Sequence, residues 1–64
     1  MIVQFEEFTK EIDKLEDVMD IDFQGCLMVQ FEKQGNDYIA VNSMNGWGEN
    51  TAAETSGKKL IILK

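Results

Sequence analysis

Apolar residues stand at helical spacing in the first third of the chain. Between residues 5 and 22 they are separated by three, four, three and four positions. They are Phe5, Phe8, Ile12, Leu15 and Met19. This spacing puts all five on one stripe of an α-helix, a pattern typical of a helix that packs on a core. We therefore predict an amphipathic helix over about residues 3–19, followed by a turn that ends at Gly25.

Beyond that turn the pattern changes to strict alternation. Leu27, Val29 and Phe31 share one face of the next segment, which predicts a strand lying on a core. Residues 38–43 predict a second strand with the same alternation. Residues 59–63 are aliphatic on both faces and predict a third strand, paired at both edges and well covered.

The loop between the first two strands fixes which side chains face each other. A three-residue loop pairs Phe31 with Ile39 and Val29 with Val41, which keeps apolar residues on one face. A two-residue loop would instead pair Phe31 with Ala40 and Val29 with a polar residue. Because a shift of one residue moves every later side chain to the other face, we predict the three-residue loop.

The long connection over residues 44–57 contains a helix signal. Thr51 and Glu54 fit a capping box, which predicts a short helical turn at about 52–56. Residues 1–64 then form one domain of the α+β class. Its N-terminal amphipathic helix packs on a small, mainly antiparallel three-stranded sheet, in the order helix, strand, strand, helical turn, strand.

Acidic residues outnumber basic ones, and the excess lies in one part of the chain. The 12 Asp and Glu against 6 Lys and Arg give a net charge of −6. Residues 1–22 hold eight acids and two lysines, whereas residues 23–64 hold four of each. A nucleic-acid-binding protein needs a basic footprint, so the sequence argues against direct contact with DNA or RNA. It indicates a partner with a basic surface instead.

The acids of the predicted helix form the main candidate binding site. With 3.6 residues per turn, Glu6, Asp13 and Asp17 fall within about 40° of each other, opposite the apolar stripe. Like-charged pairs four residues apart, such as Glu7 and Glu11, would destabilise this helix. Unfavourable local choices of this kind tend to mark a functional surface.

Trp47 adds a second part to the candidate site. It is the only tryptophan, and it lies between two glycines in the longest loop. It is either a lid over the core or an exposed anchor for a partner, because tryptophan is enriched among interface hot spots. The candidate partner-binding residues are Glu6, Asp13, Asp17, Asp20, Asp22, Trp47 and Glu49.

Signatures of catalysis and metal binding are missing. The chain has no histidine and one cysteine, Cys26, so no Ser-His-Asp or Cys-His pair can form. Residues 20–25 begin like a calcium loop, but its last position, which needs an acid, would be Phe31. We therefore expect no enzyme, no cofactor and no metal site.

Two functions remain open. The first is a small acidic inhibitor of phage or mobile-element type. It would occupy the basic groove of a nucleic-acid-handling host protein, with helix carboxylates in place of DNA phosphates. The second is a structural or assembly module that self-associates as a homodimer, the acids serving only solubility.

The acidic N-terminus, the lone thiol and the short aliphatic runs predict a cytoplasmic protein without a membrane partner, in the host cell if it is phage-encoded.

Overall fold

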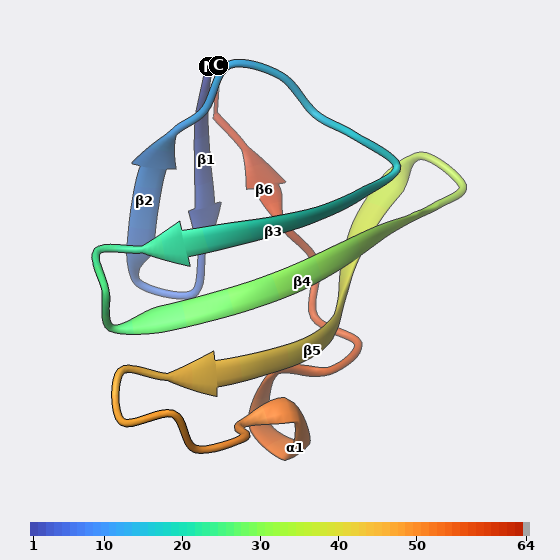
Figure 1. The fold of residues 1–64 in the computed structure, drawn as a ribbon. Helices are drawn as coiled ribbons and strands as arrows, with labels where there is room; N and C mark the ends of the chain where they lie inside the picture. Colours follow the sequence, from blue (N-terminus) through green and yellow to red (C-terminus); the bar gives the residue numbers. More distant parts are fainter. Residues whose placement is uncertain (64) are drawn as a thin grey trace.

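The computed structural model describes residues 1–63, which form six β-strands and one short helix (Figure 1). The elements are β1 (Ile2–Phe5), β2 (Phe8–Glu11), β3 (Val18–Phe23), β4 (Leu27–Gln34), β5 (Asp37–Asn45), α1 (Ala52–Thr55) and β6 (Ile61–Ile62). One antiparallel sheet has the order β2-β1-β6, and the other has the order β3-β4-β5. The predicted α+β class is therefore wrong. The described chain is mostly β, and its helix lies near the C-terminus.

The segment predicted as an N-terminal helix forms β1, β2, a connection and the start of β3. Phe5 and Phe8 stand three positions apart because they face each other across a two-residue turn. Ile12 and Leu15 lie in the connection and Met19 lies on β3, and all three are partly buried against the core. The apolar stripe is therefore real, but a hairpin and a loop produce its spacing.

Both sheets contribute to one hydrophobic core. Its buried residues are Val3, Phe5, Ile21, Phe23, Val29, Phe31, Ala40 and Leu60. Phe5 of β1 joins the sheets, because its ring centroid lies 5.3 Å from that of Phe31, edge to face, and 6.1 Å from that of Phe23. Full burial of each phenylalanine contributes about 1.5–3 kcal/mol, so these rings are a main source of stability.

The hairpin of β4 and β5 differs from the predicted one. Its loop has two residues, and Phe31 pairs with Ala40. A β-bulge follows, because Val41 has no partner on β4, and beyond it Val29 pairs with Ser43. The predicted pairs were wrong because they assumed an unbroken ladder. The bulge accommodates one extra residue and so keeps the faces matched at both ends of the hairpin.

A helical turn is present near the position that the sequence predicts, but the capping box is not. The Thr51 side chain makes no capping hydrogen bond to α1. Its hydroxyl oxygen lies 2.6 Å from Ser43 Oγ, which also lies 2.6 Å from Thr55 Oγ1. These hydroxyl groups hold α1 against β5.

In residues 1–63, no helix is long and apolar enough to cross a membrane.

β6 is an edge strand rather than the covered strand predicted for residues 59–63. Ile61 and Ile62 pair with β1, and their side chains are 50% and 46% exposed. Ile2 and Leu63 are also exposed and lie beside each other, since Leu63 N donates to Ile2 O at 2.8 Å. An apolar surface therefore lies along β1, β6 and Leu63, and Figure 1 shows β1 and β6 side by side.

Candidate partner-binding surface

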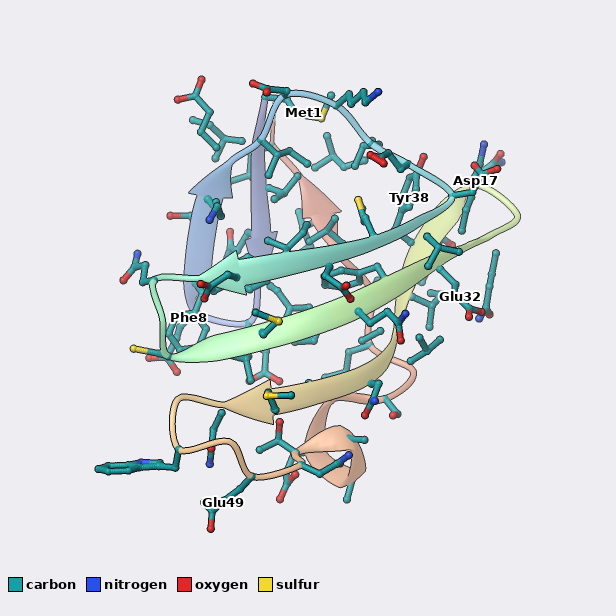
Figure 2. The ribbon with its side chains drawn as sticks, viewed as in Figure 1. Met1, Phe8, Asp17, Glu32, Tyr38 and Glu49 are labelled. Carbon is teal, nitrogen blue, oxygen red and sulfur yellow. The ribbon has the colours of Figure 1, made fainter. Side chains whose placement is uncertain are left out.

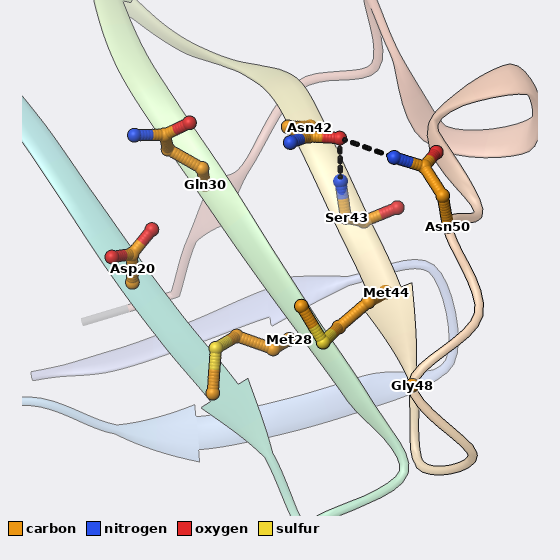
Figure 3. A pocket seen from close by; sticks show the side chains of 8 residues that line it. All are labelled: Asp20, Met28, Gln30, Asn42, Ser43, Met44, Gly48 and Asn50. Atoms are coloured by element: carbon orange, nitrogen blue, oxygen red, sulfur yellow. Dashed lines mark hydrogen bonds between the residues drawn. The ribbon is translucent and has the colours of Figure 1, made fainter.

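The sheet of β3, β4 and β5 has one face on the core and one face in solvent. Inward residues such as Ile21 and Val29 are buried, so their sequence neighbours point away from the core. We call these outward residues the outer sheet face. It consists of Val18, Asp20, Asp22, Met28, Gln30, Glu32, Gln34, Asp37, Ile39, Asn42 and Met44. Figure 3 shows Asp20, Met28, Gln30, Asn42 and Met44 on the side of the sheet away from β1 and β2.

A shallow depression of about 430 Å³ lies on this face. Met28 and Met44 pair across the strands at its lower part in Figure 3, and both are exposed. Gln30 and Asn42 form the next pair, and Asp20 stands beside Gln30 on β3. The middle of the outer sheet face is therefore apolar at one end and rich in amide groups at the other.

A hydrogen-bond network fixes the amide end of the depression. Asn42 Oδ1 accepts a hydrogen bond from Ser43 N at 3.0 Å and another from Asn50 Nδ2 at 3.2 Å (Figure 3). Asn50 Oδ1 accepts from Ala52 N at 2.9 Å, at the start of α1. These bonds join the strand, the loop and the helix, so this edge of the depression is held in place.

Charge on the outer sheet face is of one sign. Asp20, Asp22 and Glu32 are exposed there, and no lysine belongs to the face. In residues 1–63, the ion pairs within 4.0 Å are Lys58–Glu6 and Lys59–Asp37, so none involves these three carboxylates. In the described residues, three carboxylates around the two methionines therefore have no ion-pair partner, although Lys10 Nζ donates to the backbone oxygen of Asp22.

Trp47 lies at one end of this face, on a loop that is held by hydrogen bonds. Asn45 Oδ1 accepts hydrogen bonds from Trp47 N at 2.9 Å and Glu49 N at 3.0 Å, while Asn45 Nδ2 donates to Glu49 Oε1 at 2.9 Å. The main chain closes the loop as well, because Asn45 N donates to Glu49 O at 2.9 Å. The loop is thus ordered by its own bonds, although the Trp47 side chain is 88% exposed.

The Trp47 loop also packs against the turn between β3 and β4. Gly46 N donates to Cys26 O at 3.0 Å, and a Cβ on Gly46 would lie only 2.8 Å from Gly25 O. Glycine is therefore required at this contact. A second depression, of about 380 Å³, lies between the loop and the turn and is lined by Trp47 and Cys26 among others.

The structure separates the candidate residues predicted from the sequence. Asp20 and Asp22 lie together on the outer sheet face, and Trp47 and Glu49 lie in the loop at its end. The helical surface of Glu6, Asp13 and Asp17 does not exist, because these residues lie in a turn and in the connection before β3. Glu6 instead accepts a hydrogen bond from Lys58 at 2.8 Å.

Asp17 keeps a place near the outer sheet face. Its carbonyl oxygen accepts a hydrogen bond from Lys33 N at 2.8 Å, next to the pair formed by Val18 and Glu32. Figure 2 shows Asp17 and Glu32 at one end of the strands and Glu49 at the other. Acidic groups therefore stand at both ends of the face.

Sequence reasoning missed the centre of this surface. Met28, Gln30 and Glu32 follow the alternation that was used to predict the strand, and they occupy the face opposite the core. That signal could have found them. The predicted register also places Asn42 and Met44 on this face, but without the bulge at Val41 it pairs them with the wrong residues of β4, Met28 and Cys26 instead of Gln30 and Met28.

Among the described residues, no group of three or more His, Cys, Asp or Glu side chains is placed to hold a metal ion. Comparisons with protein-family models, with curated proteins and with solved structures found no match. The geometry and charge of the outer sheet face are therefore what indicates a function.

Proposed function

We propose that this chain is a protein-binding domain whose outer sheet face contacts a basic surface of a partner. The observation that carries the proposal is the combination, on one sheet face, of exposed methionines with the carboxylates of Asp20, Asp22 and Glu32, which make no ion pair in the described residues. Interfaces commonly have an apolar centre and a polar rim, and complementary charge speeds association and selects partners. Met28 and Met44 would supply the centre, and the acids would supply the rim.

We further propose that the basic surface is the nucleic-acid-binding groove of a cytoplasmic protein, which the domain would block. Asp20 and Asp22 point to the same side of β3, two residues apart along an extended chain. Strand geometry separates such residues by about 6.5 Å, so β3 presents two negative charges at that separation. A groove that holds successive phosphates is complementary to such a pair of charges.

The test compares two variants that each lose three negative charges, one on the outer sheet face and one elsewhere. A pull-down with the tagged protein should retain a basic nucleic-acid-handling protein that duplex DNA displaces. The variant Asp20→Asn, Asp22→Asn, Glu32→Gln should bind that protein about 10-fold more weakly, because it loses three favourable charges at the interface. Asn at position 22 can still accept the hydrogen bond that Gly25 N donates to Asp22 Oδ1 at 2.9 Å.

The control variant is Glu7→Gln, Glu11→Gln, Glu16→Gln, which removes the same charge outside the outer sheet face. It should bind within about 3-fold of the original protein, since long-range charge effects are screened at physiological salt. Equal weakening by both variants would show that net charge, and not this face, drives binding. A retained partner that duplex DNA cannot displace would contradict the proposed groove.

Self-association is the second candidate, and the apolar surface around β6 favours it. Ile61 and Ile62 are exposed on an edge strand, and such strands tend to pair with another chain. Light scattering over a range of protein concentrations tests it. Dimers that persist at high salt and disappear in Ile61→Lys would support an assembly role, whereas a monomer throughout would exclude it.

A further inference from the structure

Trp47 has the features of a recognition residue rather than of a lid. A lid would be buried, but the Trp47 side chain is 88% exposed, while its loop is held by hydrogen bonds that the Asn45 side chain accepts from Trp47 N and Glu49 N and donates to Glu49 Oε1. Ordering such a loop in advance lowers the entropy lost when a partner binds. The depression beside Trp47 leaves room for a side chain to lie against the ring.

The charges near Trp47 select the kind of side chain. Glu49 Oε1 accepts a hydrogen bond from Asn45 Nδ2, so the Glu49 carboxylate is held in place within the Trp47 loop. Asp22 lies on β3, before the turn that forms the other side of the depression, and its Oδ1 accepts a hydrogen bond from Gly25 N in that turn. Lys10 Nζ donates to the backbone oxygen of Asp22 at 2.8 Å, and its positive charge partly offsets the negative charge of Asp22. Glu49 is therefore the main source of negative charge beside the second depression.

We propose that the Trp47 loop is a subsite for an arginine side chain of the basic partner, with the guanidinium stacked on the indole and facing the Glu49 carboxylate. This inference rests on the proposed function, because the arginine belongs to the same basic partner. Tryptophan gives the strongest cation–π contacts of the aromatic residues. Arginine has a planar guanidinium that stacks on aromatic faces and binds carboxylates with two parallel hydrogen bonds. The lysine ammonium is not planar and can do neither.

The experiment compares two peptides of equal length and charge, one of alternating arginine and glycine and one of alternating lysine and glycine. Trp47 is the only tryptophan, so its fluorescence reports binding at this loop directly. The arginine peptide should bind about 3- to 30-fold more tightly than the lysine peptide. It should also change the tryptophan emission more strongly.

Variants then assign the preference to the subsite. Trp47→Ala, followed by calorimetry, should reduce the preference for arginine to less than about 2-fold, and Trp47→Phe should keep part of it. Glu49→Gln should reduce the preference as well, although its amide oxygen can still accept from Asn45. Because Trp47 is largely exposed, circular dichroism should show that Trp47→Ala remains folded.

The outcomes for the two proposals are separable. The Asp20→Asn, Asp22→Asn, Glu32→Gln variant should bind both peptides more weakly and keep the arginine preference. If it binds both peptides as tightly as the original protein, the outer sheet face is not the basic-partner site, but the arginine subsite stands. Equal affinity of the original protein for the two peptides, or a preference that persists in Trp47→Ala, would overturn the subsite and leave the proposed function in place.

Discussion

At the scale of single residues, three hydroxyl groups show how a small core accommodates polar atoms. Ser43 and Thr55 are buried, yet every buried side-chain oxygen or nitrogen in the described residues has a hydrogen-bond partner. Ser43 lies between Thr51 and Thr55, and Thr55 Oγ1 also donates to Thr51 O at 3.3 Å. The cluster replaces apolar packing at the contact between α1 and β5.

We expect Ser43→Ala to lower the free energy of unfolding by about 1–2 kcal/mol, because it leaves buried threonine hydroxyl groups with fewer partners. Urea unfolding followed by circular dichroism measures this change. Ser56→Ala is the matched control, since Ser56 is exposed and should change stability by less than about 0.5 kcal/mol. Equal effects of the two substitutions would mean that the cluster contributes nothing beyond an ordinary surface hydroxyl.

Some residue conformations could be predicted from the sequence and others could not. Gly25 and Gly35 have φ angles of 72° and 68°, as expected for glycines at turns. Glu6 and Gln24 also have positive φ angles, 55° and 59°. Neither Glu nor Gln favours positive φ angles. These two residues adopt them because the tight turns of the hairpins require that backbone conformation, which their own residue types do not predict.

At the scale of elements, the N-terminal pattern was misread because two structures share a spacing. Residues that flank a two-residue turn are three positions apart and share a face, as Phe5 and Phe8 do. A helix produces the same separation. The acid pairs that would have repelled each other in a helix, including Glu7 and Glu11, were evidence against the helix rather than signs of function. The alternation of Met19, Ile21 and Phe23 was the stronger signal, and it continues into β4.

Amide hydrogen exchange, followed by NMR, tests this arrangement element by element. We expect the amides of Val29 and Phe31 to exchange most slowly, because β4 is the central strand of its sheet and these residues are fully buried. Ile61 and Ile62 should exchange faster, since β6 is a short edge strand. Continuous protection across residues 5–19 would contradict the hairpin and restore the helix.

At the scale of the whole molecule, the acids lie at the surface and the charge is unbalanced. The chain carries 12 acids and 6 basic residues, and all the acids are exposed. The charge excess follows directly from the sequence, and the preference for a basic partner remains a proposal. Which acids share a face depends on the strands β3 and β4, and the helix expected over residues 3–19 hid the start of β3.

Self-repulsion among these charges should make stability depend on salt. We expect the midpoint of thermal unfolding to rise by a few degrees between about 0.01 M and about 0.5 M sodium chloride, because salt screens repulsion between exposed acids. The variant Glu7→Gln, Glu11→Gln, Glu16→Gln should show a smaller rise. A midpoint that falls with salt would show that attraction, as in the pairs Lys58–Glu6 and Lys59–Asp37, outweighs repulsion.

The bulge at Val41 gives the chain an unusual tolerance to changes in length. In most of a strand, deleting one residue turns every later side chain to the opposite side of the sheet. Here one residue of β5 has no partner, and its removal would leave Phe31 opposite Ala40 and Val29 opposite Ser43. Related chains could therefore differ by one residue at this point and still present the same binding surface, whereas a similar difference elsewhere in β5 would exchange that surface with the core.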